Sequence, residues 1–150
     1  MKRLLLILLW MPLLVLGQEC VYGDCENGFG RMTYDDEAFG TSYWGKFFKG
    51  QPQGLGEYTW GKEDNEDGTW TCYKYKGDWE NGKTNGTGIT SYIKSGFEEG
   101  GYVFEDLIWS YTGEYVNNKR NGIGVIKYPD DTGYVGYWEN GKLIKTIAEF

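Results

Sequence analysis

Histidine is absent from the chain, and with it the residue that most often acts as a general base or a metal ligand. Three cysteines without a histidine do not complete a common zinc site. No serine lies in a Gly-x-Ser-x-Gly nucleophile elbow. A pair of carboxylates is the remaining catalytic option, but most of the 22 acidic residues fall at expected turn or solvent-facing positions. The sequence therefore predicts a protein that is not an enzyme and that has no catalytic residue, cofactor or metal site.

Long apolar runs are also rare, and the chain has only one. Residues 4–16 follow a basic start and end before Gly17, which is the layout of a secretory signal peptide. The run is shorter than the roughly 20 residues that a membrane-spanning helix needs. A lipoprotein is excluded because Glu19, which is not a small residue, precedes Cys20. We expect residues 1–17 to form a signal-peptide helix and the mature protein to be secreted, periplasmic or on the cell surface.

Positive charge is scarce in the rest of the chain. Without residues 1–17 it carries 13 basic and 22 acidic residues, which is a net charge of −9. Nucleic acids and anionic lipid headgroups are bound by clustered lysine and arginine that displace counterions, so a body this acidic repels both. The charge therefore excludes nucleic acid as a partner and argues against an anionic membrane surface.

Glycine and aromatic residues are abundant: 24 residues are glycine, and 18% are aromatic. They follow a repeat of the form aromatic-x-Gly-x-aromatic. The copies begin at Tyr43, Tyr75, Tyr111 and Tyr134. In the first three copies a Gly-x-Gly segment follows at a fixed distance from the leading tyrosine. Such self-similarity is typical of repeat architectures, and this composition favours short strands joined by tight turns.

The aromatic residues of each copy recur at period 2, so that in a strand they share one face. This candidate face, which is a core, a binding groove or both, carries Tyr43, Phe47, Tyr75, Trp79, Tyr111, Tyr115, Tyr134 and Trp138. The central glycine of each copy leaves a slot between two rings, which we expect a ring of the neighbouring strand to fill. The opposite face is expected to be polar and solvated. Its residues include Lys46, Lys76, Asp78, Thr112 and Glu114.

Asparagine-glycine pairs separate the arms of the copies and tolerate the positive φ that a tight hairpin turn demands. They are Asn81-Gly82, Asn85-Gly86, Asn121-Gly122 and Asn140-Gly141. We therefore predict that each copy is a β-hairpin and that the hairpins pair side by side. The predicted fold is all-β, an elongated single-layer antiparallel sheet of tandem hairpins.

The pattern Tyr-x-Gly-x-Trp-x-x-Gly-Lys-x-x-Gly-x-Gly resembles the MORN (membrane occupation and recognition nexus) repeat. Residues 75–88 match it closely, and residues 43–56 differ in having Gln51 in place of the lysine. Residues 111–124 have Asn118 in place of a glycine, and asparagine still tolerates left-handed φ. The resemblance implies a MORN-type solenoid that associates with proteins or phospholipids.

The repeat units divide residues 18–150 into units near 20–40, 43–60, 75–92 and 111–133, followed by a half unit at 134–145. Insertions at 61–74 and 93–110 separate the units. Both have strand-like ends, so we expect longer hairpins rather than loops. Residues 143–150 could frame one short helical turn.

Cysteine usage fits an oxidising compartment. Cys20 and Cys25 flank a segment with a turn-forming Gly23-Asp24, and residues that face each other across such a hairpin are close enough for a disulfide. We predict a Cys20–Cys25 bond, which leaves Cys72 as a free thiol or as a link to another chain. A bond between Cys25 and Cys72 is the alternative.

The acidic residues 63–68 invite comparison with a calcium-binding loop. If Gly68 is the sixth loop position, Lys74 falls on the twelfth, where a bidentate glutamate is required. A solvated acidic hairpin tip is the better interpretation.

Two interpretations of the aromatic face lead to different functions. The rings can stack on one another as the core of a small sheet that has little else to bury, or part of the row can stay open as a groove. The leading functional prediction is a non-catalytic exported module that binds or scaffolds another protein. The alternatives are carbohydrate binding at the cell surface through Tyr and Trp platforms, and phospholipid association as the resemblance implies.

The signal peptide is tested by sequencing the N-terminus of protein purified from its native host. We expect cleavage between Gly17 and Gln18, because small residues precede that bond. An intact Met1 or a lipid-modified Cys20 would contradict the prediction.

Overall fold

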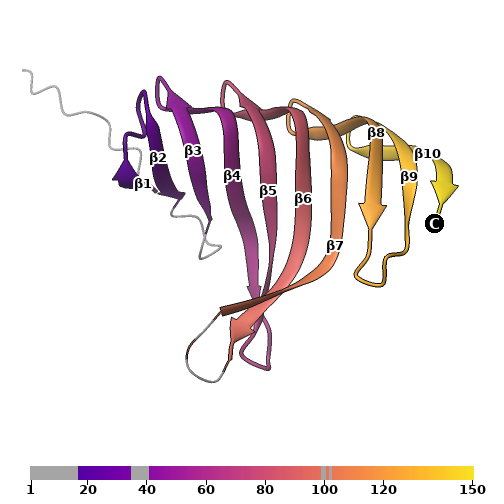
Figure 1. Ribbon diagram of the computed structural model, residues 1–150. Helices are drawn as coiled ribbons and strands as arrows, with labels where there is room; N and C mark the ends of the chain where they lie inside the picture. The colour runs from indigo at the N-terminus through magenta and orange to yellow at the C-terminus, as the bar shows by residue number, and fades with distance from the viewer. Residues whose placement is uncertain (1–16, 35–40, 99–100, 102) are drawn as a thin grey trace, which may run out of the picture.

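The computed structural model describes residues 17–34, 41–98, 101 and 103–150. The predicted signal-peptide helix lies outside these ranges except for its last residue. The described residues form one open antiparallel sheet in which each strand pairs with the next along the chain (Figure 1). The predicted single-layer sheet of tandem hairpins is therefore confirmed.

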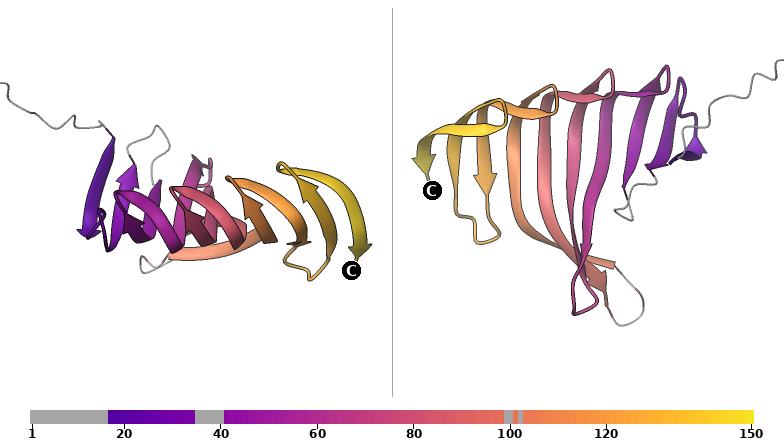
Figure 2. Two further views of the ribbon diagram at one scale, coloured as in Figure 1. Left: turned by 90° about the horizontal axis from the view of Figure 1, so that it is seen from above. Right: turned by 180° about the vertical axis from the view of Figure 1, so that it is seen from behind.

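The sheet has ten strands. They are β1 (Gln18–Gly23), β2 (Phe29–Tyr34), β3 (Ser42–Phe48), β4 (Gln51–Asp64), β5 (Trp70–Glu80), β6 (Lys83–Phe97), β7 (Val103–Val116), β8 (Lys119–Lys127), β9 (Gly133–Glu139) and β10 (Lys142–Glu149). Seen from above, the hairpins follow one another along a line and curve as they do so (Figure 2).

Four tight turns lie at one edge of the sheet and join β3 to β4, β5 to β6, β7 to β8 and β9 to β10. At each turn two successive residues have positive φ, as a type I′ turn requires. The pairs are Lys49-Gly50, Asn81-Gly82, Asn117-Asn118 and Asn140-Gly141. Asn118 has a φ of 67° and so takes the glycine conformation, as predicted.

These turns are also bonded to one another. The second N–H of each turn donates to a carbonyl of the preceding hairpin, at 2.9–3.0 Å. The bonds run from Gly50 to Glu26, from Gly82 to Pro52, from Asn118 to Thr84 and from Gly141 to Arg120. This turn ladder fixes how each hairpin stacks on the one before it.

Two of the predicted turns are bulges instead. Asn85-Gly86 and Asn121-Gly122 lie within β6 and β8, where the register with the preceding strand shifts. Gly86 and Gly122 have positive φ, and a glycine of this kind inside a strand marks a bulge that bends it. The Gly-x-Gly segment therefore bends each hairpin below its turn.

The core is a row of aromatic rings on one face of the sheet. Each of the first three leading tyrosines packs edge-on against the second aromatic residue of its own hairpin and against that of the next, with ring centroids 5.0–5.5 Å apart. This aromatic zipper runs through Phe47, Tyr43, Trp79, Tyr75, Tyr115, Tyr111 and Trp138. Edge-to-face ring pairs contribute about 0.5–1.5 kcal/mol each beyond the area that they bury, so the zipper couples neighbouring hairpins.

A pair of facing glycines lies beneath each of the first three leading tyrosines. Gly77 faces Gly88 across β5 and β6, and a Cβ built on Gly77 would lie 2.6 Å from Tyr75 Oη and 2.5 Å from Gly88 Cα. Tyr43 and Tyr111 cover their glycine pairs in the same way. The covering ring belongs to the glycine's own strand, so the prediction of a ring from the neighbouring strand was wrong for the central glycine.

Hydrogen bonds explain why each ring stays over its own strand. The tyrosine hydroxyl donates to the backbone carbonyl three residues later, from Tyr43 to Lys46 at 3.1 Å, from Tyr75 to Asp78 at 3.0 Å and from Tyr111 to Glu114 at 3.3 Å. The bond satisfies a buried hydroxyl and holds the ring over the glycines.

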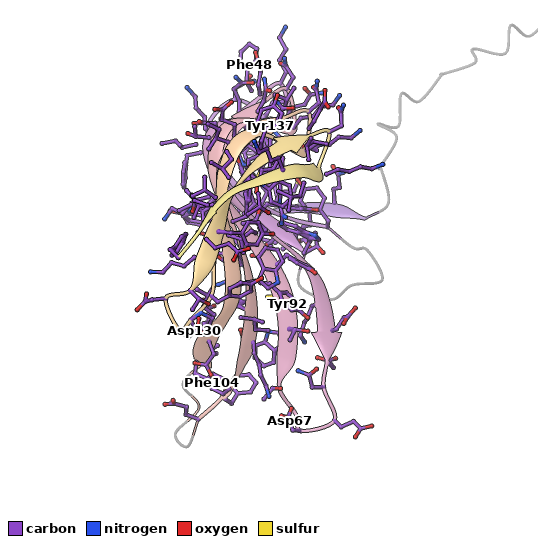
Figure 3. All side chains as sticks on the ribbon, turned by 90° about the vertical axis from the view of Figure 1, so that its right-hand side faces the viewer. Phe48, Asp67, Tyr92, Phe104, Asp130 and Tyr137 are labelled. Atoms are coloured by element: carbon purple, nitrogen blue, oxygen red, sulfur yellow. A yellow bond between two sulfur atoms is a disulfide. The ribbon has the colours of Figure 1, made fainter. Side chains whose placement is uncertain are left out.

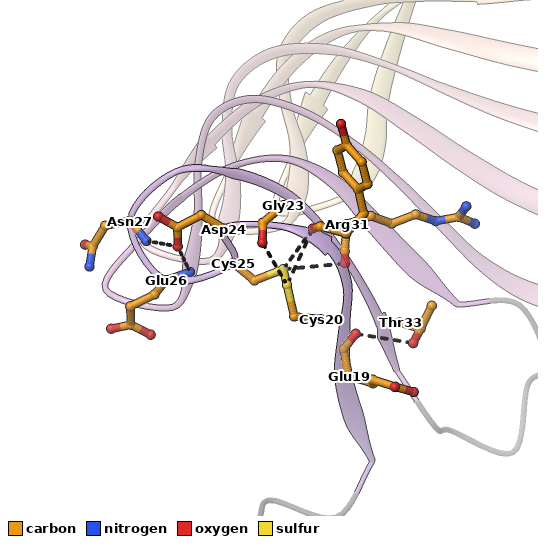
Figure 4. Close-up of a disulfide and its surroundings, with 10 residues drawn as sticks. Glu19, Cys20, Gly23, Asp24, Cys25, Glu26, Asn27, Arg31 and Thr33 are labelled. Atoms are coloured by element: carbon orange, nitrogen blue, oxygen red, sulfur yellow. Dashed lines mark hydrogen bonds between the residues drawn. A yellow bond between two sulfur atoms is a disulfide. The ribbon is translucent and has the colours of Figure 1, made fainter.

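The N-terminal end of the sheet is closed by the predicted disulfide between Cys20 and Cys25, whose Cα atoms lie 5.9 Å apart (Figure 4). The two cysteines do not face each other across a hairpin, since Cys20 pairs with Met32 and Cys25 lies in the turn after β1. Cys25 belongs to the buried core and lies over Gly30. Cys72 is a free, buried cysteine, and burial raises the pKa of its thiol.

The C-terminal end is a hairpin of β9 and β10 that contains the half unit at 134–145, and the helical turn expected at 143–150 was wrong because residues 142–149 form a strand. β10 pairs with β9 along its length, and Phe150 and Gly133 exchange backbone hydrogen bonds at 3.0 and 3.1 Å. Register shifts between Leu143 and Lys145 and between Thr146 and Ala148 break the alternation of period 2 that normally reveals a strand.

The two insertions extend strands β4 to β7 beyond the others, as long hairpins (Figure 1). Ion pairs join the two long hairpins to each other: Lys94 Nζ lies 2.9 Å from Asp67 Oδ2, and Lys74 pairs with Glu105. Figure 3 looks along the sheet, with Phe48 near the turns and Asp67 at the far tip.

Replacing Gly77 with valine tests the tyrosine-over-glycine contact. Valine favours a strand, yet its side chain would collide with Tyr75 and with the backbone of β6, so we expect the free energy of unfolding to fall by about 1–3 kcal/mol. Chemical denaturation monitored by tryptophan fluorescence measures this change.

Lys76→Val is the matched control, because Lys76 is exposed on the opposite face and should change stability by no more than about 0.5 kcal/mol. Asp78 is unsuitable since it accepts hydrogen bonds from the N–H and the hydroxyl of Thr87. A neutral Gly77→Val variant combined with a destabilised Lys76→Val variant would show that the faces are assigned the wrong way round.

Candidate functional site

Most of the predicted aromatic face is closed core. Tyr43, Phe47, Tyr75 and Tyr111 are at most 1% exposed. Trp79, Tyr115 and Trp138 are 5–7% exposed, and Tyr134 is half-buried and packs against the same cluster. These residues hold the hairpins together and leave little ring surface for a ligand.

An open groove of about 630 Å³ lies on the same face, beside the zipper, and we call it the aromatic groove. Half-buried rings stack within and between its strands: Tyr58 on Trp60 along β4 at 5.5 Å, and Trp60 on Tyr73 of β5 at 5.4 Å, with interplanar angles of 21° and 19°. Because these rings stack on one another, much of each face is covered by its neighbour. The groove therefore offers ring edges and a few polar groups.

Three aromatic residues near the groove were not predicted. Trp60, Tyr73 and Trp109 lie at the ends of the repeat units or in the insertions, outside the repeat pattern. Each is two residues from a tyrosine of the pattern, so the rule of period 2 places it on the same face. That spacing is the sequence signal that could have found them.

Two cationic residues, Lys119 and Arg120, line the aromatic groove, and Arg120 is the one that packs on its rings. Its guanidinium carbon lies 4.7 Å from the ring centroid of Tyr111 and 5.1 Å from those of Trp109 and Trp138. Within the described ranges, the ion pairs are all made by lysines. Arg120 thus has aromatic neighbours and no carboxylate partner among these residues.

Two buried polar side chains also line the aromatic groove. Trp79 and Thr84 are 7% and 8% exposed, and neither Trp79 Nε1 nor Thr84 Oγ1 has a hydrogen-bond partner among the described residues. Leaving a buried donor or acceptor unpaired costs about 1–3 kcal/mol. The groove therefore combines a cation with polar groups that the protein itself leaves unpaired.

The opposite face of the sheet is less polar than expected. Lys46, Lys76, Asp78, Thr112 and Glu114 lie there as predicted, but exposed apolar residues are interleaved with them. This apolar face, whose central groove measures about 770 Å³, consists of Phe29, Trp44, Leu55, Ile89, Ile123 and Tyr137. At its N-terminal end Tyr22 stacks on Trp44 at 5.4 Å.

The expectation of a polar face failed for a physical reason. Phe29, Leu55 and Ile123 each occupy the middle of a Gly-x-Gly segment. Their side chains point away from the zipper, so neither the bulge nor the core specifies what they are.

The acidic tip of the β4–β5 hairpin is held by its own hydrogen bonds. The side-chain hydrogen bonds that Asp67 accepts from Thr69 and Lys94 hold its pKa well below the usual value. No cluster of residues suited to a metal ion occurs in the described part of the chain. No helix in those ranges has the length and hydropathy to cross a membrane.

The zipper tyrosines should make stability depend on alkaline pH. Burial, and then the nearby Tyr115, raise the pKa of Tyr111 from 10.0 to about 12, and burial also raises the pKa of Tyr43 and Tyr75. A raised folded-state pKa gives stability that is complete below pH 10 and is lost as the pH rises toward about 12. Denaturation midpoints measured across this range should fall steadily.

Tyr111→Phe is the control for this titration. It removes one ionising hydroxyl, so its midpoint should start lower and fall less steeply above pH 10. A wild-type midpoint that stays constant up to pH 12 would contradict the assignment of these hydroxyls to the core.

A family model of the MORN repeat matches residues 43–64, 75–96 and 111–133. The matched segments begin at Tyr43, Tyr75 and Tyr111, the three tyrosines that cover glycine pairs. A search of curated proteins found no match to the chain. Sequence pattern, hairpin geometry and family model agree, and this chain is a MORN-repeat protein.

Proposed function

We propose that this chain is a non-catalytic exported module that binds or scaffolds another protein through its apolar face. MORN repeats serve as binding or scaffolding modules, and the family is generally non-catalytic. Beyond this general role, we propose that the partner is a protein, that it contacts the apolar face, and that binding takes place outside the cytoplasm.

The observation that carries the proposal is the exposure of the apolar face. Leu55 is 73% exposed and Ile123 is 57% exposed, at positions where the fold does not require an apolar residue. Contiguous exposed apolar residues among polar ones are typical of protein interaction surfaces. Trp44, 42% exposed and flanked by Phe29 and Tyr22, is of the residue type that most often dominates binding energy at interfaces.

Charges on the apolar face favour a protein over the alternative partners. Both signs occur, since Glu57 faces Lys76 and Leu55 faces Asp78 across β4 and β5. The net charge of −9 without residues 1–17 disfavours anionic lipid. A carbohydrate would need open ring faces, whereas the rings of the aromatic groove cover one another.

Export is part of the proposal for two reasons. Residues 1–17 have the layout of a signal peptide. The Cys20–Cys25 disulfide is of the kind that persists in an oxidising compartment.

The test is affinity capture from the compartment that contains the processed protein, followed by titration of the purified partner. We expect the double variant Leu55→Ser/Ile123→Ser to bind the partner at least about tenfold more weakly, since it removes two exposed apolar contacts. The unfolding midpoint should stay unchanged.

Phe97→Ser/Val103→Ser is the matched control, because both residues are similarly exposed but lie at the far end of the β6–β7 hairpin, away from the residues of the apolar face. This variant should bind like wild type. Equal losses in the two double variants, or binding to defined glycans in place of a protein, would overturn the proposal.

A further inference from the structure

The aromatic groove contains one position that recurs in successive hairpins with a different side chain each time. Pro52, Thr84 and Arg120 each lie two residues after the second residue of a turn, and the carbonyl of each accepts a bond of the turn ladder. All three line the groove. From one hairpin to the next, the groove changes from apolar to hydroxyl to cationic.

We infer that the aromatic groove binds an extended peptide segment whose carboxylate lies against the Arg120 guanidinium. This site is separate from the apolar face, which lies on the other side of the sheet. The inference rests on three features. They are an arginine without a carboxylate partner, two buried polar side chains without partners, and the change from apolar to cationic along the row formed by Pro52, Thr84 and Arg120.

The carboxylate assignment follows from charge. Arg120 has no acidic partner among the described residues, although acidic residues outnumber basic ones in the chain. Its guanidinium is close to three aromatic rings, and an arginine in such surroundings forms stronger ionic hydrogen bonds than one in open water. A carboxylate is the planar anion that a guanidinium binds through two parallel hydrogen bonds.

The peptide assignment follows from the unpaired polar atoms. Trp79 Nε1, which has no partner among the described residues, can donate one hydrogen bond, and the Thr84 hydroxyl can both donate and accept. A peptide backbone supplies both kinds of partner through its C=O and N–H groups.

The spacing of the row fixes the length of the ligand. Equivalent positions in successive hairpins are two strands apart, which is about 10 Å, so the row from Pro52 to Arg120 covers about 20 Å. An extended peptide rises about 3.3 Å per residue and therefore spans the row in about six residues. The ligand that fits has an apolar residue at the Pro52 end and an acidic residue about five positions later.

The experiment uses two synthetic peptides with isotope-labelled mature protein. The first is acetyl-Leu-Ala-Gly-Ser-Ala-Asp-amide, and the second replaces the aspartate with asparagine. We expect the acidic peptide to shift the indole N–H resonances of Trp79, Trp109 and Trp138 and to bind at least about tenfold more tightly than its amide analogue. Equal binding of the two peptides, or no shift with either, would overturn the inference.

Variants then separate binding from structure. Arg120→Met should remove the preference for the acidic peptide, whereas Arg31→Met, an exposed arginine that pairs with Trp44 on the opposite face, should retain it. Thr84→Val should raise the unfolding midpoint, since it removes an unpaired buried hydroxyl, and should weaken both peptides. If Arg120→Met does not fold, the comparison of acid and amide on wild-type protein still decides the matter.

Two further outcomes identify other occupants. A uronic-acid oligosaccharide that binds more tightly than the acidic peptide would overturn the peptide assignment. Leu55→Ser/Ile123→Ser should bind the acidic peptide like wild type, and a loss there would show that the two faces are not separate sites. If Leu55→Ser/Ile123→Ser bound its protein partner like wild type while the acidic peptide still bound the aromatic groove, the proposed function would be overturned and this inference would stand.

Discussion

The fold depends on a tyrosine ring that lies over two facing glycines and bonds its hydroxyl to its own strand. A single-layer sheet has no second layer against which to bury side chains, so it must create its interior from its own surface. The glycine pair Gly77 and Gly88 lets the ring of Tyr75 approach the backbone, and the carbonyl of Asp78 satisfies the hydroxyl. The ring is then held in the orientation that the zipper needs.

Because of the zipper and the turn ladder, the stability of the array is approximately a sum of contacts between neighbouring hairpins. In addition to the backbone pairing of their adjacent strands, each hairpin contacts the next through one edge-to-face ring pair and one turn hydrogen bond, as in the contact between Tyr43 and Trp79 and the bond from Gly82 to Pro52. Repeat proteins of this kind are stabilised by contacts between neighbours, so their ends need separate treatment. Here Cys25, in its disulfide, lies over Gly30 at one end, and Leu143 lies over Gly136 at the other.

The repeat leaves certain positions free, and these are where the binding surfaces lie. The middle residue of Gly-x-Gly is Leu55 in one unit, Thr87 in the next and Ile123 in the third, because the bulge does not depend on it. The position shared by Pro52, Thr84 and Arg120 varies even more, since the turn ladder uses only the carbonyl of that residue. The invariant positions of the pattern build the sheet, and the variable positions give each face its chemistry.

The sequence by itself determined the class of fold, the hairpin units and the aromatic zipper of the core. The alternation of Tyr75, Gly77 and Trp79 follows from local backbone geometry, and a periodic pattern reveals local geometry directly. The turns at Asn81 and Asn140 and the Cys20–Cys25 bond were predictable for the same reason, because they join residues close in the chain.

Only the tertiary structure decided which ring covers which glycine, where the strands bulge and what lines the grooves. Asn85-Gly86 has the same local preference as Asn81-Gly82, and only the pairing of β6 with β5 makes it a bulge. Arg120 comes close to Trp109 and Trp138 because β7, β8 and β9 are adjacent. Contacts between hairpins depend on register and bend, which are set by the whole array, so no single segment of the sequence contains them.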